Sequence, residues 1–220
     1  MLRKKWLSNL LWLTFTQAFI GISQVEAGLL GDYASSYKPV KVEQRRTLGS
    51  GSRDRCVSNL PSKSLTLLVP QSKVVHQTSS STPSFYLSSK VASTLPFKFT
   101  LVDPRVAEPL VEQTFAISQP GINKIELPET TKLEEGTVYL WYVAIPCHQD
   151  RGEYQEVLGA AIERVPVTTK LKTQLQQAKS NSETAAVYAR NGIWYEAIDR
   201  AIHDSGNYLQ QLLSNIGITS

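Results

Sequence analysis

Histidine is scarce in this sequence, and His76, His148 and His203 lie far apart along the chain. No two of them have the spacing that places two imidazoles on one face of a helix, so a zinc site is not indicated. The G-x-S-x-G motif of a hydrolase nucleophile elbow is also missing. We therefore predict no catalytic residues, no metal ligands and no cofactor from motifs.

One polar loop does gather chemically capable side chains, because His148, Asp150 and Glu153 lie close together in it. They could hold a hard cation, but no calcium-loop pattern and no second cluster supports such a site. The pair Glu134 and Glu135 precedes a turn glycine. We interpret both groups as solvated charges.

The first 27 residues have the parts of a secretory signal. Basic residues at positions 3–5 precede an apolar run over residues 6–22, and Val25 and Ala27 stand three and one before a plausible cleavage point. We predict that residues 1–27 are a signal peptide, so that the mature protein is periplasmic or otherwise extracytoplasmic. The alternative is a retained anchor, although the run contains polar residues and is shorter than a clean span of about 20. No membrane span is expected after cleavage.

The excess of positive over negative charge is small once the signal is removed. The whole chain has 23 basic and 19 acidic residues, for a net charge of +4. Without Arg3, Lys4, Lys5 and Glu26 the balance is 20 against 18, a net charge of +2. This gives little electrostatic reason to expect nucleic acid as a partner. A protein of the cell envelope or a glycan is the expected partner.

Only two cysteines occur, Cys56 and Cys147. In an exported chain they are interpreted most simply as one structural disulfide, because thiols are oxidised outside the cytoplasm. The alternative makes Cys147 a nucleophile assisted by His148. Neighbouring residues on a strand point to opposite faces, which argues against that pairing.

The chain divides by composition into an arm, a β-rich segment and a helical segment. Residues 28–55 are rich in Ser, Gly and basic residues and are predicted to be a disordered basic arm. Residues 56–167 contain short β-type runs separated by Pro, Gly, Ser and Asp, which predict a sandwich of about seven antiparallel strands. The expected strands cover residues 65–69, 84–87, 97–102, 111–117, 122–127, 138–145 and 157–165. The run 139–145 is apolar on both faces and is expected to be central.

A tyrosine-containing pattern links this segment to a known fold. The motif L-x-x-G-x-x-Y-x-W-x-V is formed by Leu133, Gly136, Tyr139, Trp141 and Val143. It resembles the corner and strand of fibronectin-type and other immunoglobulin-like domains. The resemblance implies that the Tyr139 ring packs in the core while its hydroxyl caps a loop carbonyl.

After Pro166 the apolar period changes from two to about 3.6 residues. Residues 168–220 are predicted to be helical, with helices over 170–179, from 182 to the Asn-Gly at 191–192, over 193–203 and over 207–216. A pattern of small and aromatic residues resembles one tetratricopeptide-type helical hairpin; it is formed by Ala185, Tyr188, Gly192, Trp194 and Ala197. Small side chains let two helices approach, and the glycine supplies the turn.

Tyr188, Trp194 and Tyr195 form an aromatic cluster outside the strands. They are interpreted either as packing between helices or, if exposed, as a candidate interaction surface for a sugar or peptide. The adjacency of Trp194 and Tyr195 predicts that one of them points away from whatever the other packs on.

The order of these segments is similar to that of a known family. The segments that carry the resemblance are LTLLVP (65–70), TPSFYL (82–87), LEEGTVYLWYVAIPC (133–147) and YARNGIWYEAI (188–198). They resemble Domain of Unknown Function family 928, which is known chiefly from cyanobacteria. The resemblance implies an exported protein, and the family supplies no catalytic residues to carry over.

These observations favour a non-enzymatic, extracytoplasmic protein-interaction or scaffold module of the cell envelope. The first alternative is a carbohydrate or cell-wall binding module that uses exposed aromatic side chains. The second is an envelope hydrolase with an unrecognised site.

The disulfide prediction can be checked by a non-reducing peptide mass map of the exported protein. We expect one peptide pair linked through Cys56 and Cys147, which separates on reduction. Such a bridge would remove about 4.5 kcal/mol of chain entropy from the unfolded state. Alkylation of both cysteines without prior reduction would contradict the prediction.

Overall fold

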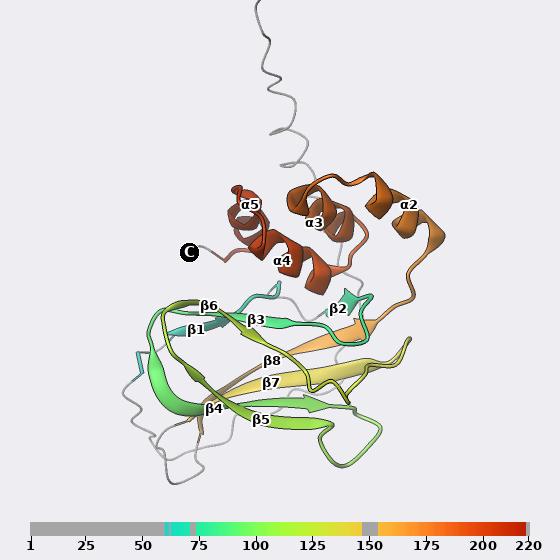
Figure 1. Cartoon of the computed structure of the whole chain (residues 1–220). Coiled ribbons are helices and arrows are strands. Elements are labelled where there is room, and N and C mark those ends of the chain that lie inside the picture. The colour runs from blue at the N-terminus through green and yellow to red at the C-terminus, as the bar shows by residue number, and fades with distance from the viewer. Residues whose placement is uncertain (1–59, 62, 71–73, 147–153, 219–220) are drawn as a thin grey trace, which may run out of the picture.

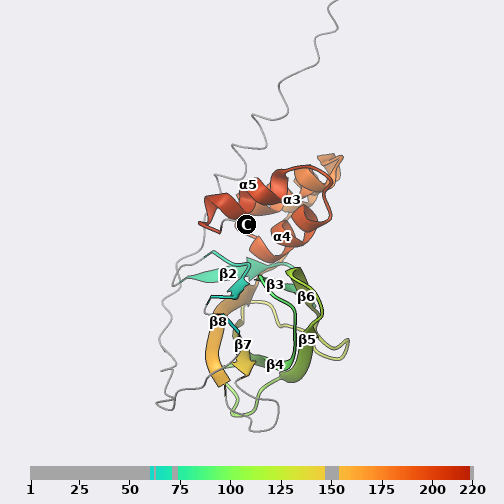
Figure 2. The ribbon, with the colours of Figure 1, turned by 90° about the vertical axis from the view of Figure 1, so that its left-hand side faces the viewer.

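The computed structural model describes residues 60–61, 63–70, 74–146 and 154–218 of the chain. In these ranges the protein is mainly β, with a three-stranded and a five-stranded sheet followed by four helices. The helices lie together on one side of the strands (Figures 1 and 2). We refer to the two sheets, residues 65–164, as the two-sheet body, and to the helices, residues 169–215, as the helical layer.

The smaller sheet is antiparallel throughout. It has the order β1-β3-β6, with β1 at Leu65–Leu67, β3 at Phe85–Ser89 and β6 at Gly121–Ile125. Gly121 opens β6 with a φ of +115°, a backbone conformation that side chains disfavour. The chain therefore bends at Pro120-Gly121 as it enters this sheet.

The larger sheet has the order β2-β8-β7-β4-β5. Its strands are β2 (Val75–Thr78), β4 (Ser93–Val102), β5 (Val111–Ile117), β7 (Val138–Pro146) and β8 (Tyr154–Arg164). β7 lies between β8 and β4, which confirms the prediction of a central strand. Its alternate residues Tyr139, Trp141 and Val143 are buried in the core.

The strand prediction needs two corrections. The described residues form eight strands rather than about seven, because β2 was missed; three of the four side chains in its sequence VHQT are polar. β2 also pairs parallel with β8, so the expectation of an all-antiparallel sandwich is wrong. The immunoglobulin-like arrangement itself stays a prediction, whereas a β-rich segment followed by helices is confirmed.

Aromatic side chains from both sheets meet in the core. The Phe85 ring of β3 lies 5.1 Å from that of Phe99 on β4 and 4.9 Å from that of Trp141 on β7, centre to centre. The tilted geometry of these pairs is the one that aromatic quadrupoles favour. The two sheets are therefore joined through a shared aromatic cluster.

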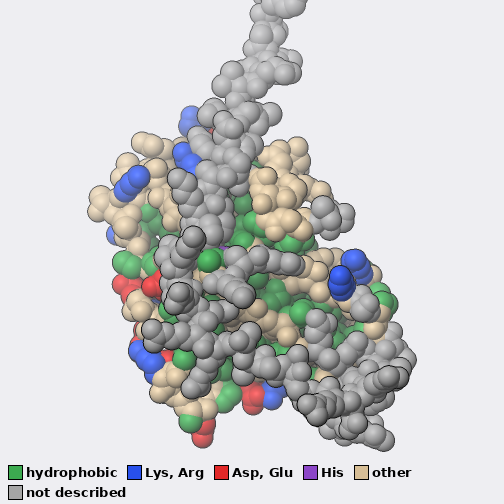
Figure 3. Space-filling view, turned by 180° about the vertical axis from the view of Figure 1, so that it is seen from behind, with side chains coloured by type: hydrophobic (Ala, Val, Ile, Leu, Met, Phe, Trp, Pro, Cys, Tyr) green, Lys and Arg blue, Asp and Glu red, His purple; other side chains and the backbone are tan. Residues whose placement is uncertain are grey.

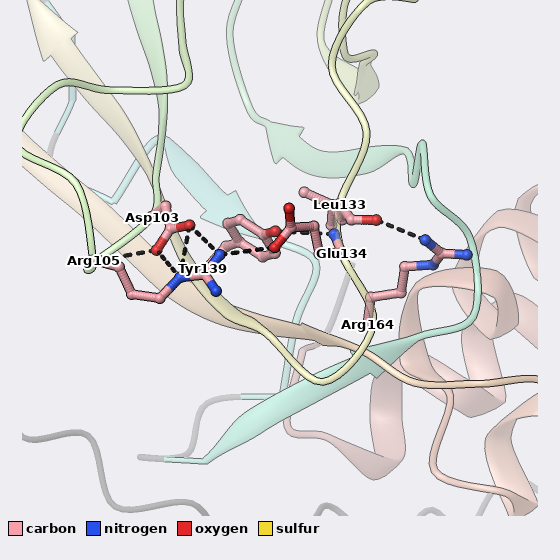
Figure 4. A network of polar contacts seen from close by, with 6 residues as sticks. All are labelled: Asp103, Arg105, Leu133, Glu134, Tyr139 and Arg164. Carbon is pink, nitrogen blue, oxygen red and sulfur yellow. Dashed lines mark hydrogen bonds and ion pairs between the residues drawn. The ribbon is translucent and has the colours of Figure 1, made fainter.

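A polar network holds the turn that leads into β7 (Figure 4). The Tyr139 hydroxyl accepts a hydrogen bond of 2.9 Å from the Glu134 backbone N–H. The sequence resemblance implied a bond to a loop carbonyl, so the polarity of this bond is the reverse of the expected one. Arg164 donates from Nη1 to the Leu133 carbonyl at 2.7 Å, which holds the same turn from β8.

Arg105 joins a second loop to this turn. Its guanidinium contacts both carboxylate oxygens of Asp103, the nearer at 2.6 Å, and also reaches Glu134 Oε2 at 3.0 Å. The hydrogen bonds from Arg105 hold the pKa of Asp103 below its ordinary value. The network in Figure 4 thus binds two loops at one end of the larger sheet.

The helical layer consists of α2 (Thr169–Gln177), α3 (Asn181–Arg190), α4 (Trp194–Ile202) and α5 (Tyr208–Asn215). Thr168 and Ser180 accept hydrogen bonds from backbone N–H groups of the first turn of α2 and α3, respectively, as N-caps. Gly192, with a φ of +78°, forms the predicted turn between α3 and α4. No helix of the described residues is long and apolar enough to span a membrane.

Helices α3 and α4 pack together, and their small residues are buried. Ala185 and Ala197 of the predicted hairpin are fully buried, as are Ala189 on α3 and Ala201 on α4. Methyl side chains at these positions let the two helix backbones approach closely. The physical reason given for the hairpin motif therefore agrees with the packing.

The corner hydrogen bond can be tested with Tyr139→Phe, which removes only the hydroxyl. We expect a loss of about 1–2 kcal/mol in the free energy of unfolding, because the Glu134 N–H loses its partner. Tyr142→Phe on the same strand is the control, since its hydroxyl has no hydrogen bond to any residue that the structure describes and its loss should stay within about 0.5 kcal/mol. Equal losses in urea unfolding would show that the corner bond adds nothing.

Candidate functional site

Helix α4 is fastened to the two-sheet body by hydrogen bonds from two indoles. Trp194 Nε1 donates to the Leu68 carbonyl at 2.9 Å, and Trp141 Nε1 donates to the Tyr195 hydroxyl at 2.8 Å. Tyr195 also packs its ring edge against Phe85, 5.6 Å away. Each polar tip thus finds a partner in an otherwise apolar contact.

These contacts overturn the idea of an exposed aromatic surface at Trp194 and Tyr195. Their side chains are 0 % and 2 % exposed, so neither is available as a binding platform. The expectation that one of the pair points away from what the other packs on stays a prediction, although neither side chain points into solvent. Successive helical residues are separated by about 100°, and α4 packs on β2 as well as on α3, so both fall within its buried arc. Tyr188 is half-buried.

Two carboxylates of α4 extend the attachment to strand β3 and to the end of β2 with the loop that follows it. Tyr86 donates from its hydroxyl to Asp199 Oδ1 at 2.5 Å. Burial, together with this carboxylate, raises the pKa of Tyr86 and keeps its hydroxyl protonated as a donor. Glu196 lies one turn earlier on the same helix.

Glu196 uses its two oxygens differently. Oε1 accepts three hydrogen bonds, from Thr78 Oγ1 at 2.7 Å and from the backbone N–H groups of Ser79 and Ser80 at 3.0 and 2.8 Å. Oε2 is buried and has no hydrogen-bond partner within the described ranges. Burial raises the pKa of the Glu196 carboxyl, and the hydrogen bonds offset part of that rise.

A pocket of about 270 Å³ lies between α4 and this loop. We call it the α4 pocket. It is lined by hydroxyl-bearing loop residues, two tyrosines and three charged side chains: Ser79, Ser80, Thr82, Pro83, Ser84, Tyr188, Tyr195, Glu196, Asp199 and Arg200. Two carboxylates and one guanidinium give the lining a formal charge of −1.

A wider groove of about 880 Å³ lies on the helical layer itself. We call it the helical groove. Most of the residues that line it are of polar type. They come from α2, α3, the turn between α4 and α5, and the start of α5: Gln174, Gln177, Ala178, Lys179, Ser180, Ser182, Glu183, Val187, Arg190, Asp204, Ser205, Gly206, Asn207 and Tyr208. The Tyr208 hydroxyl is buried without a hydrogen-bond partner in the described residues, and burial raises its pKa.

One family model covers most of the sequence. The model of the Domain of Unknown Function (DUF928) family matches residues 48–215, more than half of the sequence. The chain belongs to the DUF928 family. This confirms the resemblance drawn from the four sequence segments. No curated protein and no solved structure matches the chain.

Several residues singled out from the DUF928 sequence lie outside the described ranges. They are Cys56, Cys147, His148, Asp150 and Glu153. The predicted disulfide and the polar loop therefore stay predictions. Within the described ranges no group of three or more His, Cys, Asp or Glu side chains is arranged to hold a metal ion.

Sequence reasoning missed Glu196 and Asp199 as site residues. Glu196 belongs to the segment 188–198 that carries the family resemblance, and Asp199 follows that segment directly. Their spacing of three residues on a helix is nevertheless common on solvated faces. Their partners Thr78, Ser79 and Tyr86 are more than 100 residues away along the chain. Only that long-range contact distinguishes them from surface charges.

His76 of this DUF928 protein offers a test of burial beside α4. Its ring is 1 % exposed on β2 and contacts the Pro70 carbonyl at 3.1 Å through Nε2. Burial lowers the pKa of His76 from 6.5 to about 4. In the unfolded chain His76 therefore binds a proton as the pH falls through 6.5, whereas in the folded chain it binds one only near pH 4.

The contribution of neutral His76 to the free energy of unfolding should thus be fully present above pH 6.5 and should be lost as the pH falls toward 4. We expect wild type to lose about 3 kcal/mol relative to His76→Gln across that interval, measured by urea unfolding at several pH values. Comparison with the variant cancels the contribution of Glu196, whose raised pKa acts in the opposite direction. Parallel stability curves would contradict the burial effect.

Proposed function

We propose that this protein is a non-enzymatic interaction module that acts outside the cytoplasm in the cell envelope. In this proposal the two-sheet body is a platform, and the helical layer binds a protein partner along the helical groove. The single observation that carries it is the attachment of α4 through Trp194, Tyr195, Glu196 and Asp199. A helix fixed at four points can present its neighbours α3 and α5 in a constant geometry.

The composition of the helical groove favours a polar peptide segment as its occupant. Lys179 and Arg190 lie in the same lining as Glu183 and Asp204, so both signs of charge are offered. Amide and hydroxyl side chains supply further donors and acceptors between them. The volume of about 880 Å³ is near the upper end of pockets that hold one small molecule.

The distribution of charge is consistent with a protein rather than a nucleic acid partner. Seen from the back of the molecule, side chains of both signs are interspersed around the margin and hydrophobic side chains lie toward the middle (Figure 3). Nucleic-acid binding usually requires a continuous basic surface. The small net charge of the mature chain agrees with this view.

Export remains part of the proposal and rests on the signal-like segment 1–27. The immunoglobulin-like relationship is a further part of it. The Tyr139 corner supports that relationship, whereas the parallel pairing of β2 with β8 departs from it. The interaction function does not depend on this relationship, because it requires only a rigid platform.

The two alternatives have less support. A carbohydrate-binding role was based on exposed aromatic side chains, and Trp194 and Tyr195 are buried. A hydrolase role was based only on export and size, and the polar loop with His148, Asp150 and Glu153 lies outside the described ranges. The helical groove therefore remains the better basis for a function.

The proposal predicts site-specific photocrosslinking from the helical groove in intact cells. A photoreactive phenylalanine at Gln177 and one at Ser205, on two sides of the groove, should give adducts with the same envelope protein. The same residue at Thr114, exposed on β5, is the control and should not give that adduct. Immunoblots and mass spectrometry of the adducts provide the measurement.

Two results would contradict the proposal. The first is no adduct from either groove position in chains that are folded and exported. The second is the same set of adducts from Thr114 as from Gln177, which would indicate nonspecific collision rather than binding at the groove.

A further inference from the structure

Glu196 has an unsatisfied acceptor that its structural role does not explain. Three donors on Oε1 already hold the loop between β2 and β3, and they fix the orientation of the carboxylate. Oε2 is nevertheless buried without a partner in the described part of the chain. An isolated buried acceptor costs about 1–3 kcal/mol, and more when the group is charged. A donor from outside the chain would remove that cost.

The position of Glu196 shows where such a donor would enter. Glu196 lines the α4 pocket, and Asp199 lines the same pocket one turn later. Arg200 is the basic member of the lining, and no ion pair within 4 Å joins it to either carboxylate in the described ranges. The pocket therefore combines an excess of negative charge with a free acceptor.

We propose that the α4 pocket binds a small molecule through one primary ammonium group, which donates to Glu196 Oε2. The charge of the ammonium offsets the net charge of −1 contributed by Glu196, Asp199 and Arg200. Its remaining N–H groups suit the hydroxyl oxygens of the loop, such as those of Ser80 and Ser84. A volume of about 270 Å³, just below the usual range of ligand pockets, limits the ligand to a small molecule of about the size of one sugar ring.

A neutral hydroxyl compound fits the same pocket less well. A sugar hydroxyl could donate to Oε2, but it would leave the negative charge of the lining without a counter-charge. The half-buried ring of Tyr188, which also lines the pocket, adds a favourable environment for a cation. This ligand is independent of the protein partner proposed for the helical groove, which has a different lining.

The test uses matched probe molecules and an amide NMR titration of the mature chain. Ethanolamine and ethylene glycol have the same size and differ in one ammonium group. We expect ethanolamine to shift the amide signals of Ser79, Ser80 and Glu196 with a Kd on the order of millimolar, and ethylene glycol to bind at least tenfold more weakly. Glucosamine and glucose repeat the comparison on a sugar ring.

Glu196→Gln is the decisive variant because it preserves shape. The amide oxygen can still accept from Thr78, Ser79 and Ser80, while an NH₂ donor replaces Oε2. We expect at least a tenfold loss of ethanolamine affinity. Glu108→Gln, in an exposed loop, makes the same change of charge and should bind as wild type does.

Each other outcome would overturn the proposal. Equal binding of glucose and glucosamine would assign the pocket to polyols. Unchanged affinity in Glu196→Gln would mean that Oε2 contacts only ordered water. An equal loss in Glu108→Gln would indicate general electrostatic attraction. If Glu196→Gln does not fold, the test is the affinity of the wild-type chain for ethanolamine compared with ethylene glycol. Equal affinity for the two probes would contradict an ammonium site.

Discussion

The seating of helix α4 on the two-sheet body is the interaction on which the rest of the structure depends. Trp194 and Tyr195 are adjacent in sequence, and both bury large rings that carry one polar atom each. A buried indole N–H or phenol needs a hydrogen-bond partner. The Leu68 carbonyl accepts from the Trp194 indole and the Trp141 indole donates to the Tyr195 hydroxyl, so these two bonds help to fix the position of α4.

Both candidate sites follow from that position. Because α4 lies against the loop between β2 and β3, Glu196 and Asp199 meet Thr78 and Tyr86 and enclose the α4 pocket. Because α3 packs on α4 through small residues, the outer side of the layer is left to α2, α3 and α5, which line the helical groove. A fixed helix thus separates an inner, acidic pocket from an outer, mixed-charge groove.

The strands and helices could largely be predicted from the sequence, because their signals are local. Alternation and Pro or Gly punctuation located seven strands to within a few residues, and the change of period after Pro166 located four helices. The strand β2 was missed because His76 and Gln77 interrupt its apolar pattern. Its parallel pairing with β8 was not predictable from spacing, since no local signal encodes the direction of a distant partner.

The sequence by itself determined the element types, the corner tyrosine, the helical hairpin and the family, because propensity, period and motif residues are properties of neighbouring positions. Tertiary structure alone decided which aromatic side chains are buried and which carboxylates form a site. The sequence pattern around Trp194 and Tyr195 does not distinguish buried from exposed aromatic residues, and only the contact with the two-sheet body shows that they are buried. Glu196 likewise resembles a solvated helix charge until contacts more than 100 residues away bury it. Burial depends on what packs against a residue, and that is set by long-range contacts.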